Sequence, residues 1–324
     1  MKPYSEEVAC NMSLEKYALK RFIEIIPVFL IVLSIVFLML HLIPGDPAKN
    51  ILGIMATPES LEQLRETLGL NEPIYKQFYR FMRRLVVGDF GHSIRYKAPV
   101  TMLIFARLKV TLALVCMAGI LSVIFSLPIS LYAAKKHRKF TDYSIGVSSL
   151  FVFSMPEFWT GLLFLNIFGL KLGWFPTGGW GTGVLNNLYH LIMPSVILGL
   201  FLTALVTRTL RSDMLEVLQK EYIRLARTYG FSDIKIYTKY ALKNALLPTI
   251  TVIGLNLGWL LGSSVVIETV FSLPGIGAML LDAVIVRDYP LIQGISLIFA
   301  LAIMLNNYVV DIIYGLIDPR IYRT

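Results

Sequence analysis

Residues 221–248 read EYIRLARTYGFSDIKIYTKYALKNALLP and lie between two apolar runs that are each long enough to cross a bilayer. A membrane span needs about 20 apolar residues. The quoted stretch is basic and amphipathic, and one glycine, Gly230, divides it into two short helical halves. A segment of this kind between two spans is exposed to water, and its pattern favours a surface that docks another molecule.

The chain as a whole is too apolar for a soluble globular protein. Hydrophobic residues make up 56% of its 324 residues, charged residues only 16%, and the mean hydropathy is +0.68. We therefore predict an all-α membrane protein with six transmembrane helices. The runs of span length with little or no charge are 25–45, 110–134, 143–170 (interrupted by Glu157), 188–207, 244–267 and 289–310.

The distribution of Lys and Arg predicts the orientation in the membrane. If the N-terminus is cytoplasmic, the two short outer loops keep only Lys171 and Arg287. The long segment after the first span is also basic, but a loop of this length is translocated largely regardless of its charge. We expect both termini in the cytoplasm. Anchoring there and contact with anionic membrane lipid account for the net charge of +9, so we predict no nucleic-acid partner.

Signatures of catalysis are missing from the sequence. It contains no G-x-x-x-x-G-K-[ST] phosphate loop, no H-E-x-x-H motif and no G-x-S-x-G elbow. The four histidines are scattered singly, and two cysteines, Cys10 and Cys116, are too few for a disulfide framework. We predict a chain that is not an enzyme and that binds no metal or nucleotide itself.

Polar residues at membrane depth are candidates for a transport path, because they are costly there. We select Glu157, Asn256 and Glu268. For Glu157 a position with access to water is an equal alternative, since Pro156 can break the helix. For Glu268, which ends the fifth span, solvation at the membrane interface is an alternative.

Three glycines in the fifth span, Gly254, Gly258 and Gly262, follow each other at intervals of four residues. This spacing puts them on one helix face and permits close helix packing. Contact within this subunit and contact across a dimer interface remain equally open.

Helical patterns are also visible outside the spans. We predict two helices in the long outer segment, over 57–70 and 73–87. In the quoted stretch we predict a second helix from Ser232, as its N-cap, to about Asn244, with Pro248 in the first turn of the fifth span or marking its start. A basic hairpin lying on anionic lipid is the alternative to docking. A first amphipathic helix that ends at Gly230 is indicated by an apolar spacing of 3, 4, 3, 4 at Leu215, Leu218, Tyr222, Leu225 and Tyr229.

The quoted stretch resembles the cytoplasmic loop through which permease subunits of ATP-binding-cassette (ABC) importers engage their ATPases. Of the general pattern, E-A-A-x-x-x-G followed by I-x-L-P, only Ala226, Gly230 and Leu242 match, and Arg224 stands at the first acidic position. The B-type permeases of dipeptide, oligopeptide and nickel importers instead carry R-x-A-R-x-x-G and A-L-R-N-A-x-x-P. This chain has the first pattern at 224–230 and reads ALKNALLP at 241–248; LIPGDP at 42–47, SMPEFW at 154–159 and ETVFSLPGIG at 268–277 extend the resemblance.

The resemblance implies a type I ABC importer permease fold in the cell (inner) membrane. It implies four partners: a second, related permease, two cytoplasmic ATPases that bind ATP and Mg, and an extracytoplasmic substrate-binding protein. Peptides are the expected cargo, while nickel chelates, glutathione and oligosaccharides remain open; a secondary transporter or channel is the alternative class. The residues that the resemblance assigns to ATPase docking are Glu221, Tyr222, Arg224, Leu225, Ala226, Arg227, Gly230 and Leu242.

The same resemblance gives the domain organisation. We expect a cytoplasmic N-terminus (1–21), a first transmembrane helix with an extracytoplasmic segment (22–107), a permease core (108–318) and a cytoplasmic tail (319–324). In the core we expect helices at about 108–134, 143–170, 188–211, 245–268 and 290–317, with the docking loop at 212–244.

Overall fold

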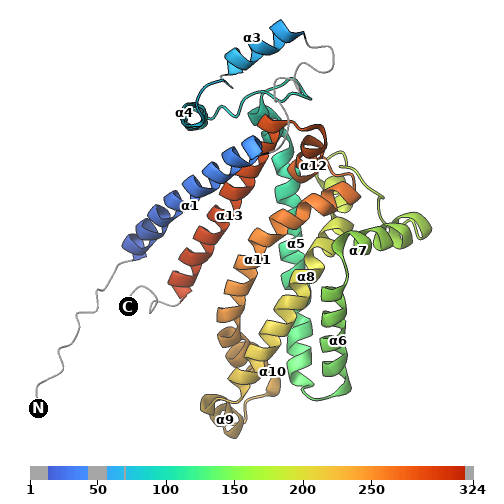
Figure 1. Ribbon diagram of the computed structural model, residues 1–324. Coiled ribbons are helices and arrows are strands. Elements are labelled where there is room, and N and C mark those ends of the chain that lie inside the picture. The colour runs from blue at the N-terminus through green and yellow to red at the C-terminus, as the bar shows by residue number, and fades with distance from the viewer. Residues whose placement is uncertain (1–13, 43–56, 69–70, 318–324) are drawn as a thin grey trace, which may run out of the picture.

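The computed structural model of the protein describes residues 14–42, 57–68 and 71–317. In these residues every regular element is a helix, and one isolated bridge joins His92 to Pro99. Figure 1 shows long helices running side by side, with α12 near one end of the molecule and α9 at the other. The predicted all-α class is confirmed.

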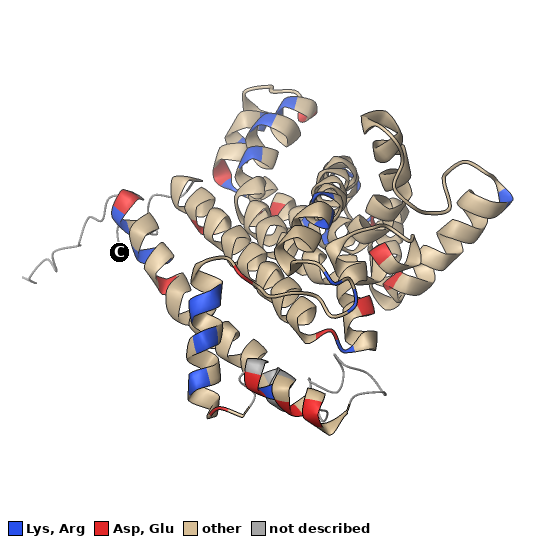
Figure 2. Cartoon of the chain, turned by 90° about the horizontal axis from the view of Figure 1, so that it is seen from above, with Lys and Arg blue, Asp and Glu red and all other residues tan. Residues whose placement is uncertain are grey.

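The described residues contain five helices that are long and apolar enough to cross a membrane, and a sixth span if one bent pair is counted. Seen from above, most residues of the long helices are uncharged, and Lys and Arg occur in groups (Figure 2). The five helices are α1 (Leu14–Leu42), α5 (Val100–Lys135), α8 (Val184–Leu218), α11 (Leu242–Val270) and α13 (Tyr289–Ile317).

The third predicted span is not one straight helix. It consists of α6 (Phe140–Ser154) and α7 (Glu157–Phe164), which continues as the π-helix η1 (Leu165–Lys171). The two parts are bent by 104°. Met155 between them has extended backbone, with φ −89° and ψ 128°, as expected before a proline that cannot continue a helix.

The outer segment forms two short helices, as predicted, α3 (Pro58–Leu68) and α4 (Ile74–Val86). The apolar side of α4 packs on α1, where the rings of Phe78 and Phe81 lie 5.2 Å and 5.7 Å from the ring of Phe37. These contacts hold α4 at the end of the first span.

The centre of the bundle is formed by α5, α8 and α11, which share one buried apolar cluster. On the outside α13 packs on α11, and α1 packs on α13. At the margin of that outer pair Arg21 forms an ion pair with Asp311 at 3.6 Å. The first span is therefore peripheral, because among the described spans it packs mainly on α13.

The first amphipathic helix predicted over 215–229 is wrong as a single element. Helix α8 continues to Leu218, where 35 residues extend over about 50 Å and exceed the roughly 30 Å of membrane hydrocarbon. The chain then breaks, because Lys220 is extended with φ −69° and ψ 149°, and α9 (Glu221–Thr228) begins anew.

The second half of the predicted hairpin is the beginning of the fifth span. After α10 (Asp233–Lys235) and the π-helix η2 (Ile236–Ala241), the chain passes into α11 without a break. Ser232 precedes α10 as predicted, but its side chain forms no capping hydrogen bond. Pro248 lies inside α11, which begins at Leu242, and the predicted second helix and the fifth span are one continuous helical segment.

Candidate functional site

Helix α9 ends in a turn that requires a glycine. Gly230 has φ +77°, a left-handed conformation that side chains with a Cβ rarely adopt. Around it the backbone N–H of Phe231 donates to the carbonyl of Ala226 at 3.2 Å, and the N–H of Gly230 donates to Arg227 at 3.0 Å. These bonds satisfy carbonyls at the helix end, so the predicted glycine C-cap is confirmed.

One side of α9 is fixed to the rest of the chain by apolar contacts. Ile223 and Ala226 are buried against Ile236 of η2, and Leu218 and Tyr240 pack on the same cluster. The amide of Asn244 also donates to the hydroxyl of Tyr222 at 2.9 Å, and the rings of Phe231 and Tyr240 stack at 5.7 Å. Helix α9 is thus seated on the base of α11.

The other side of α9 is exposed and carries both apolar and basic groups. Leu225 is 58% exposed and Tyr229 79% exposed. Arg224 and Arg227 are exposed as well, and neither forms an ion pair with another described residue. A surface of this composition can bind a groove with an acidic rim.

The structure therefore brings most of the predicted docking residues together on one helix and its turn. Two of them differ from the rest. Ala226 is buried, which makes it part of the seat of α9 and not of its exposed face. Leu242, at the start of α11, packs on a buried cluster with Ala245 and Leu210, away from that face.

A continuous path of apolar contacts leads from α9 into the spans. Leu218 packs on the cluster beneath α9 and also on a second cluster, which joins the ends of α5 and α8 to η2 and the start of α11. Helix α9 is therefore connected by apolar contacts to α8 and, through η2, to α11.

The transport-path candidates Glu157 and Asn256 lie on a shared surface. Glu157 begins α7, which packs on α11, the helix that carries Asn256. Between them Trp259 of α11 packs on Phe201 of α8, with ring centroids 4.5 Å apart. Of the residues on this surface, the sequence singled out only Glu157 and Asn256. The contact between Phe201 and Trp259 depends on the packing of α8 on α11 and has no signal in the sequence.

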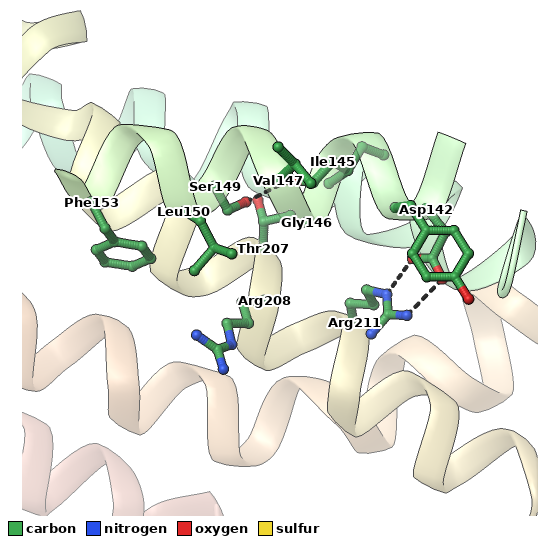
Figure 3. A pocket seen from close by; sticks show the side chains of 11 residues that line it. Asp142, Ile145, Gly146, Val147, Ser149, Leu150, Phe153, Thr207, Arg208 and Arg211 are labelled. Atoms are coloured by element: carbon green, nitrogen blue, oxygen red, sulfur yellow. Dashed lines mark hydrogen bonds and ion pairs between the residues drawn. The ribbon is translucent and has the colours of Figure 1, made fainter. Parts of the chain in front are cut away.

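A cavity of about 330 Å³ continues this surface toward α9, between α6 and α8. Figure 3 shows Leu150 and Phe153 of α6 above Arg208 of α8, with the ion pair of Asp142 and Arg211 at the other side. That pair is bidentate, at 2.5 Å and 2.6 Å. It fastens the beginning of α6 to α8 and closes one end of the cavity.

The third path candidate, Glu268, occupies a different environment. Its side chain is 0% exposed, and its carboxylate accepts hydrogen bonds from the hydroxyl of Thr111 at 2.6 Å and the N–H of Ala278 at 2.9 Å. The expectation of a solvated position at the membrane interface is wrong. Glu268 instead joins α11 to α5 and to α12 (Ile276–Val286).

A second buried carboxylate, Asp288, was missed in the sequence. It is 0% exposed, at the end of α12, and accepts hydrogen bonds from the hydroxyl of Ser93 at 2.5 Å and the N–H of Arg95 at 3.0 Å. Nothing local marks this residue, because its partners lie almost 200 positions earlier. Together Glu268 and Asp288 hold both ends of α12.

The glycines of the fifth span separate into two groups. Gly254 faces Val310, and Gly258 faces Ile303 and Asn306, so both pack on α13 within this chain. Gly262 has no atom within 4 Å of the position of a Cβ. Contact within this subunit therefore accounts for Gly254 and Gly258, and packing at Gly262 across an interface with a second subunit stays a prediction.

Metal ligands are not gathered in the described residues. In 14–42, 57–68 and 71–317, no three His, Cys, Asp or Glu side chains come together to hold a metal ion.

Comparison with known protein families also indicates a membrane component of a transport system. The profile of the binding-protein-dependent transport system inner membrane component matches residues 126–323. The profile of the N-terminal part of such membrane components matches residues 14–115.

Two relatives cover almost the whole chain. It is 38% identical to the oligopeptide transport system permease protein AppB of Bacillus subtilis (strain 168), and the alignment covers 94% of this chain and 98% of that protein. It is 39% identical to the glutathione transport system permease protein GsiC of Escherichia coli (strain K12), with the same coverage of 94% and 98%.

Proposed function

We propose a function from the premise that this chain belongs to the family of binding-protein-dependent transport system inner membrane components, and that it is a permease subunit of an ABC importer of the dipeptide and oligopeptide class. Such permeases are multi-pass membrane proteins and are not catalytic; the ATPase lies in partner subunits. Our proposal is that this chain imports peptides and couples their passage to ATP hydrolysis through α9.

The observation that carries the proposal is the two-sided character of α9. Its inner side, with Ile223, is seated on η2 and α11, whereas Leu225, Tyr229 and the arginines are exposed. Burying an exposed leucine and tyrosine is favourable, so a partner that covers α9 lowers the free energy of the complex. We assign this partner as a cytoplasmic ATPase, with two ATPases serving this chain and a second permease.

The remaining parts of the proposal follow from this assignment. Both termini lie in the cytoplasm, together with α9, and the opposite end receives a peptide from an extracytoplasmic binding protein. ATP and Mg are bound by the ATPases and not by this chain. Movement of α9 passes to α8 and α11 because Leu218 belongs to both apolar clusters.

Peptides are the proposed cargo because similar permeases are named for oligopeptide and for glutathione transport. Glutathione is the second candidate, and it is favoured by the 39% identity to the glutathione permease. Competition for uptake distinguishes the two: excess alanine tetrapeptide should inhibit uptake of a labelled tetrapeptide strongly, and excess glutathione weakly.

The docking role is tested with Leu225→Asp, which places a charge on the exposed face and leaves the seat of α9 intact. We expect the ATPases to be lost when the permease is purified, because the exposed side chain lies in the proposed interface. The matched control is Ile285→Asp on α12, since Ile285 is 71% exposed at the other end of the molecule. If Leu225→Asp retains the ATPases and transport, α9 is not the docking element.

A further inference from the structure

We propose that the surface formed by α6, α8 and α11 binds peptides with free termini. Glu157 binds the α-ammonium group of the peptide, and Arg208 binds its α-carboxylate. This assignment rests on the proposed function, because it requires that the cargo is a peptide.

The middle of this surface is an aromatic wall, defined here as Phe153, Phe201 and Trp259. The rings of Phe153 and Phe201 meet edge to face at 4.7 Å, and those of Phe201 and Trp259 lie 4.5 Å apart. Trp259 is still 42% exposed although it lies near the centre of a span. Aromatic faces pack on side chains of many shapes, which suits a cargo of variable sequence.

At the upper end of the wall Glu157 has an incomplete set of partners. Its Oε1 is buried, and among the described residues no group donates a hydrogen bond to it. A buried carboxylate oxygen without a partner is unfavourable, so the position calls for a cation or a donor.

At the lower end Arg208 is the charged group available to a ligand. It lies two turns after Phe201 on the same face of α8, about 10 Å along the helix. In Figure 3 it lies on the side of Leu150 and Phe153, apart from Asp142. Asp142 is bound by Arg211 at 2.6 Å, whereas Arg208 forms no ion pair with any described residue.

The two charges favour a zwitterion over the other possible occupants. The phosphate of an anionic lipid would bind Arg208 but would leave the Oε1 of Glu157 without a donor. An apolar helix of a second permease would cover the aromatic wall and satisfy neither charge. A peptide presents a cation and an anion on one chain, with side chains between them to pack on the wall.

The experiment measures shielding of the cavity by peptide. Leu150 is 57% exposed and lines it, so Leu150→Cys reports on its occupancy, in a background where Cys10 and Cys116 are replaced by serine. Membranes with the assembled importer are treated with a maleimide, with and without alanine tetrapeptide. Ile120→Cys, on an exposed face of α5, serves as the control position.

We expect the free tetrapeptide to slow modification of Leu150→Cys and to leave Ile120→Cys unchanged. Adding Glu157→Gln should raise the half-protecting concentration about tenfold, and Arg208→Gln should do the same. The N-acetylated peptide should not respond to Glu157→Gln, nor the peptide amide to Arg208→Gln, because each lacks the charge concerned. Lys139→Gln, an exposed basic residue outside the cavity, is the control for lost charge.

Three results would overturn the assignment. The first is a free peptide that protects neither cysteine, or both equally. The second is Leu150→Cys that stays unreactive because another permease or lipid covers it. The third is a loss of protection that is the same for free and blocked peptides. None of these depends on α9, so binding of the ATPases decides the docking proposal separately.

Discussion

Helix α12 is held to its neighbours by buried carboxylates, whereas α9 is held to the rest of the chain mainly by apolar contacts. Glu268 and Asp288 bind Thr111 and Ser93, both outside α12, through hydrogen bonds of 2.6 Å and 2.5 Å. Helix α9 instead rests on the small cluster around Ile223. The two ends lie far apart along the spans (Figure 1).

This difference matters because the two kinds of contact respond differently to displacement. A hydrogen bond to a buried carboxylate depends strongly on distance and angle, so its elements move together or not at all. Apolar contacts are not directional and tolerate small shifts. Helix α12 is therefore suited to move as one body with α5 and α11, and α9 is suited to shift when a partner binds.

The largest effect is expected when the buried carboxylate at the α12 end is removed. Glu268→Ala leaves the hydroxyl of Thr111 and the N–H of Ala278 without their acceptor and creates a cavity; we expect a loss of about 3 kcal/mol or more. Thermal unfolding of the purified permease in detergent measures this loss. Asp282→Ala, on the partly exposed face of α12, is the control and should change the midpoint little. Equal shifts for both variants would remove the special role of Glu268.

A smaller effect is expected at the α9 end from Ile223→Ala. This change deletes a fully buried side chain from a small peripheral cluster, so we expect a local loss of about 2 kcal/mol. Hydrogen exchange of the α9 amides should accelerate, while exchange in α12 stays constant. Leu225→Ala is the matched control, because the same truncation on the exposed face leaves exchange in the free permease unaltered. Acceleration throughout the bundle would contradict the separation of the two ends.

The second carboxylate is tested through its donor. Ser93→Ala removes the hydroxyl that Asp288 accepts, although the N–H of Arg95 remains, and we expect a loss of about 1 to 2 kcal/mol in unfolding free energy. Ser154→Ala is the control, since that hydroxyl bonds only to the carbonyl of Leu150 in its own helix. Unchanged stability of Ser93→Ala would show that Asp288 contributes little to the α12 end.

The smallest effect is expected from Gly230→Ala. A Cβ at this position meets no neighbour, so the cost arises only from the left-handed φ of +77° and amounts to about 1 kcal/mol. We expect a small drop in stability and a clear drop in peptide-stimulated ATPase activity, since the turn at Gly230 sets the orientation of α9. Gly88→Ala is the matched control, because Gly88 also has a left-handed φ, of +75°, and open space at its Cβ position but lies after α4; it should lose as much stability and keep its ATPase activity. If both variants lower the ATPase activity equally, the turn at Gly230 does not set the position of α9.

Some parts of this fold were accessible from local sequence, and others were not. Five spans, α3, α4 and the glycine turn at Gly230 were predicted correctly, because each depends on neighbouring residues. The break between α6 and α7 was suspected from Pro156, but the angle of 104° depends on packing, where Gly161 of α7 lies close to Val270. The single apolar stripe predicted over 215–229 is wrong because the extended residue Lys220 interrupts the helix. The apolar residues before and after it therefore belong to two helices, α8 and α9, and do not form one face.

The candidate site shows the same division. Glu157 and Asn256 were selected because polar side chains in spans are rare, and the fold brings them to one surface. Arg208 was not selected, since a basic residue at the end of a span resembles an ordinary anchor. That Arg208 is available to a ligand depends on tertiary packing, because Asp142 binds Arg211 and not Arg208.

The sequence by itself determined that this protein is an all-α membrane protein with a glycine-terminated basic helix between its later spans, because hydropathy and turn conformation are properties of short segments. Only the tertiary structure decided which polar side chains are satisfied and which are free. Thr111 and Glu268 are 157 positions apart, and Ser93 and Asp288 are 195. A hydrogen bond between such residues exists only after the spans have packed, so no local pattern can report it.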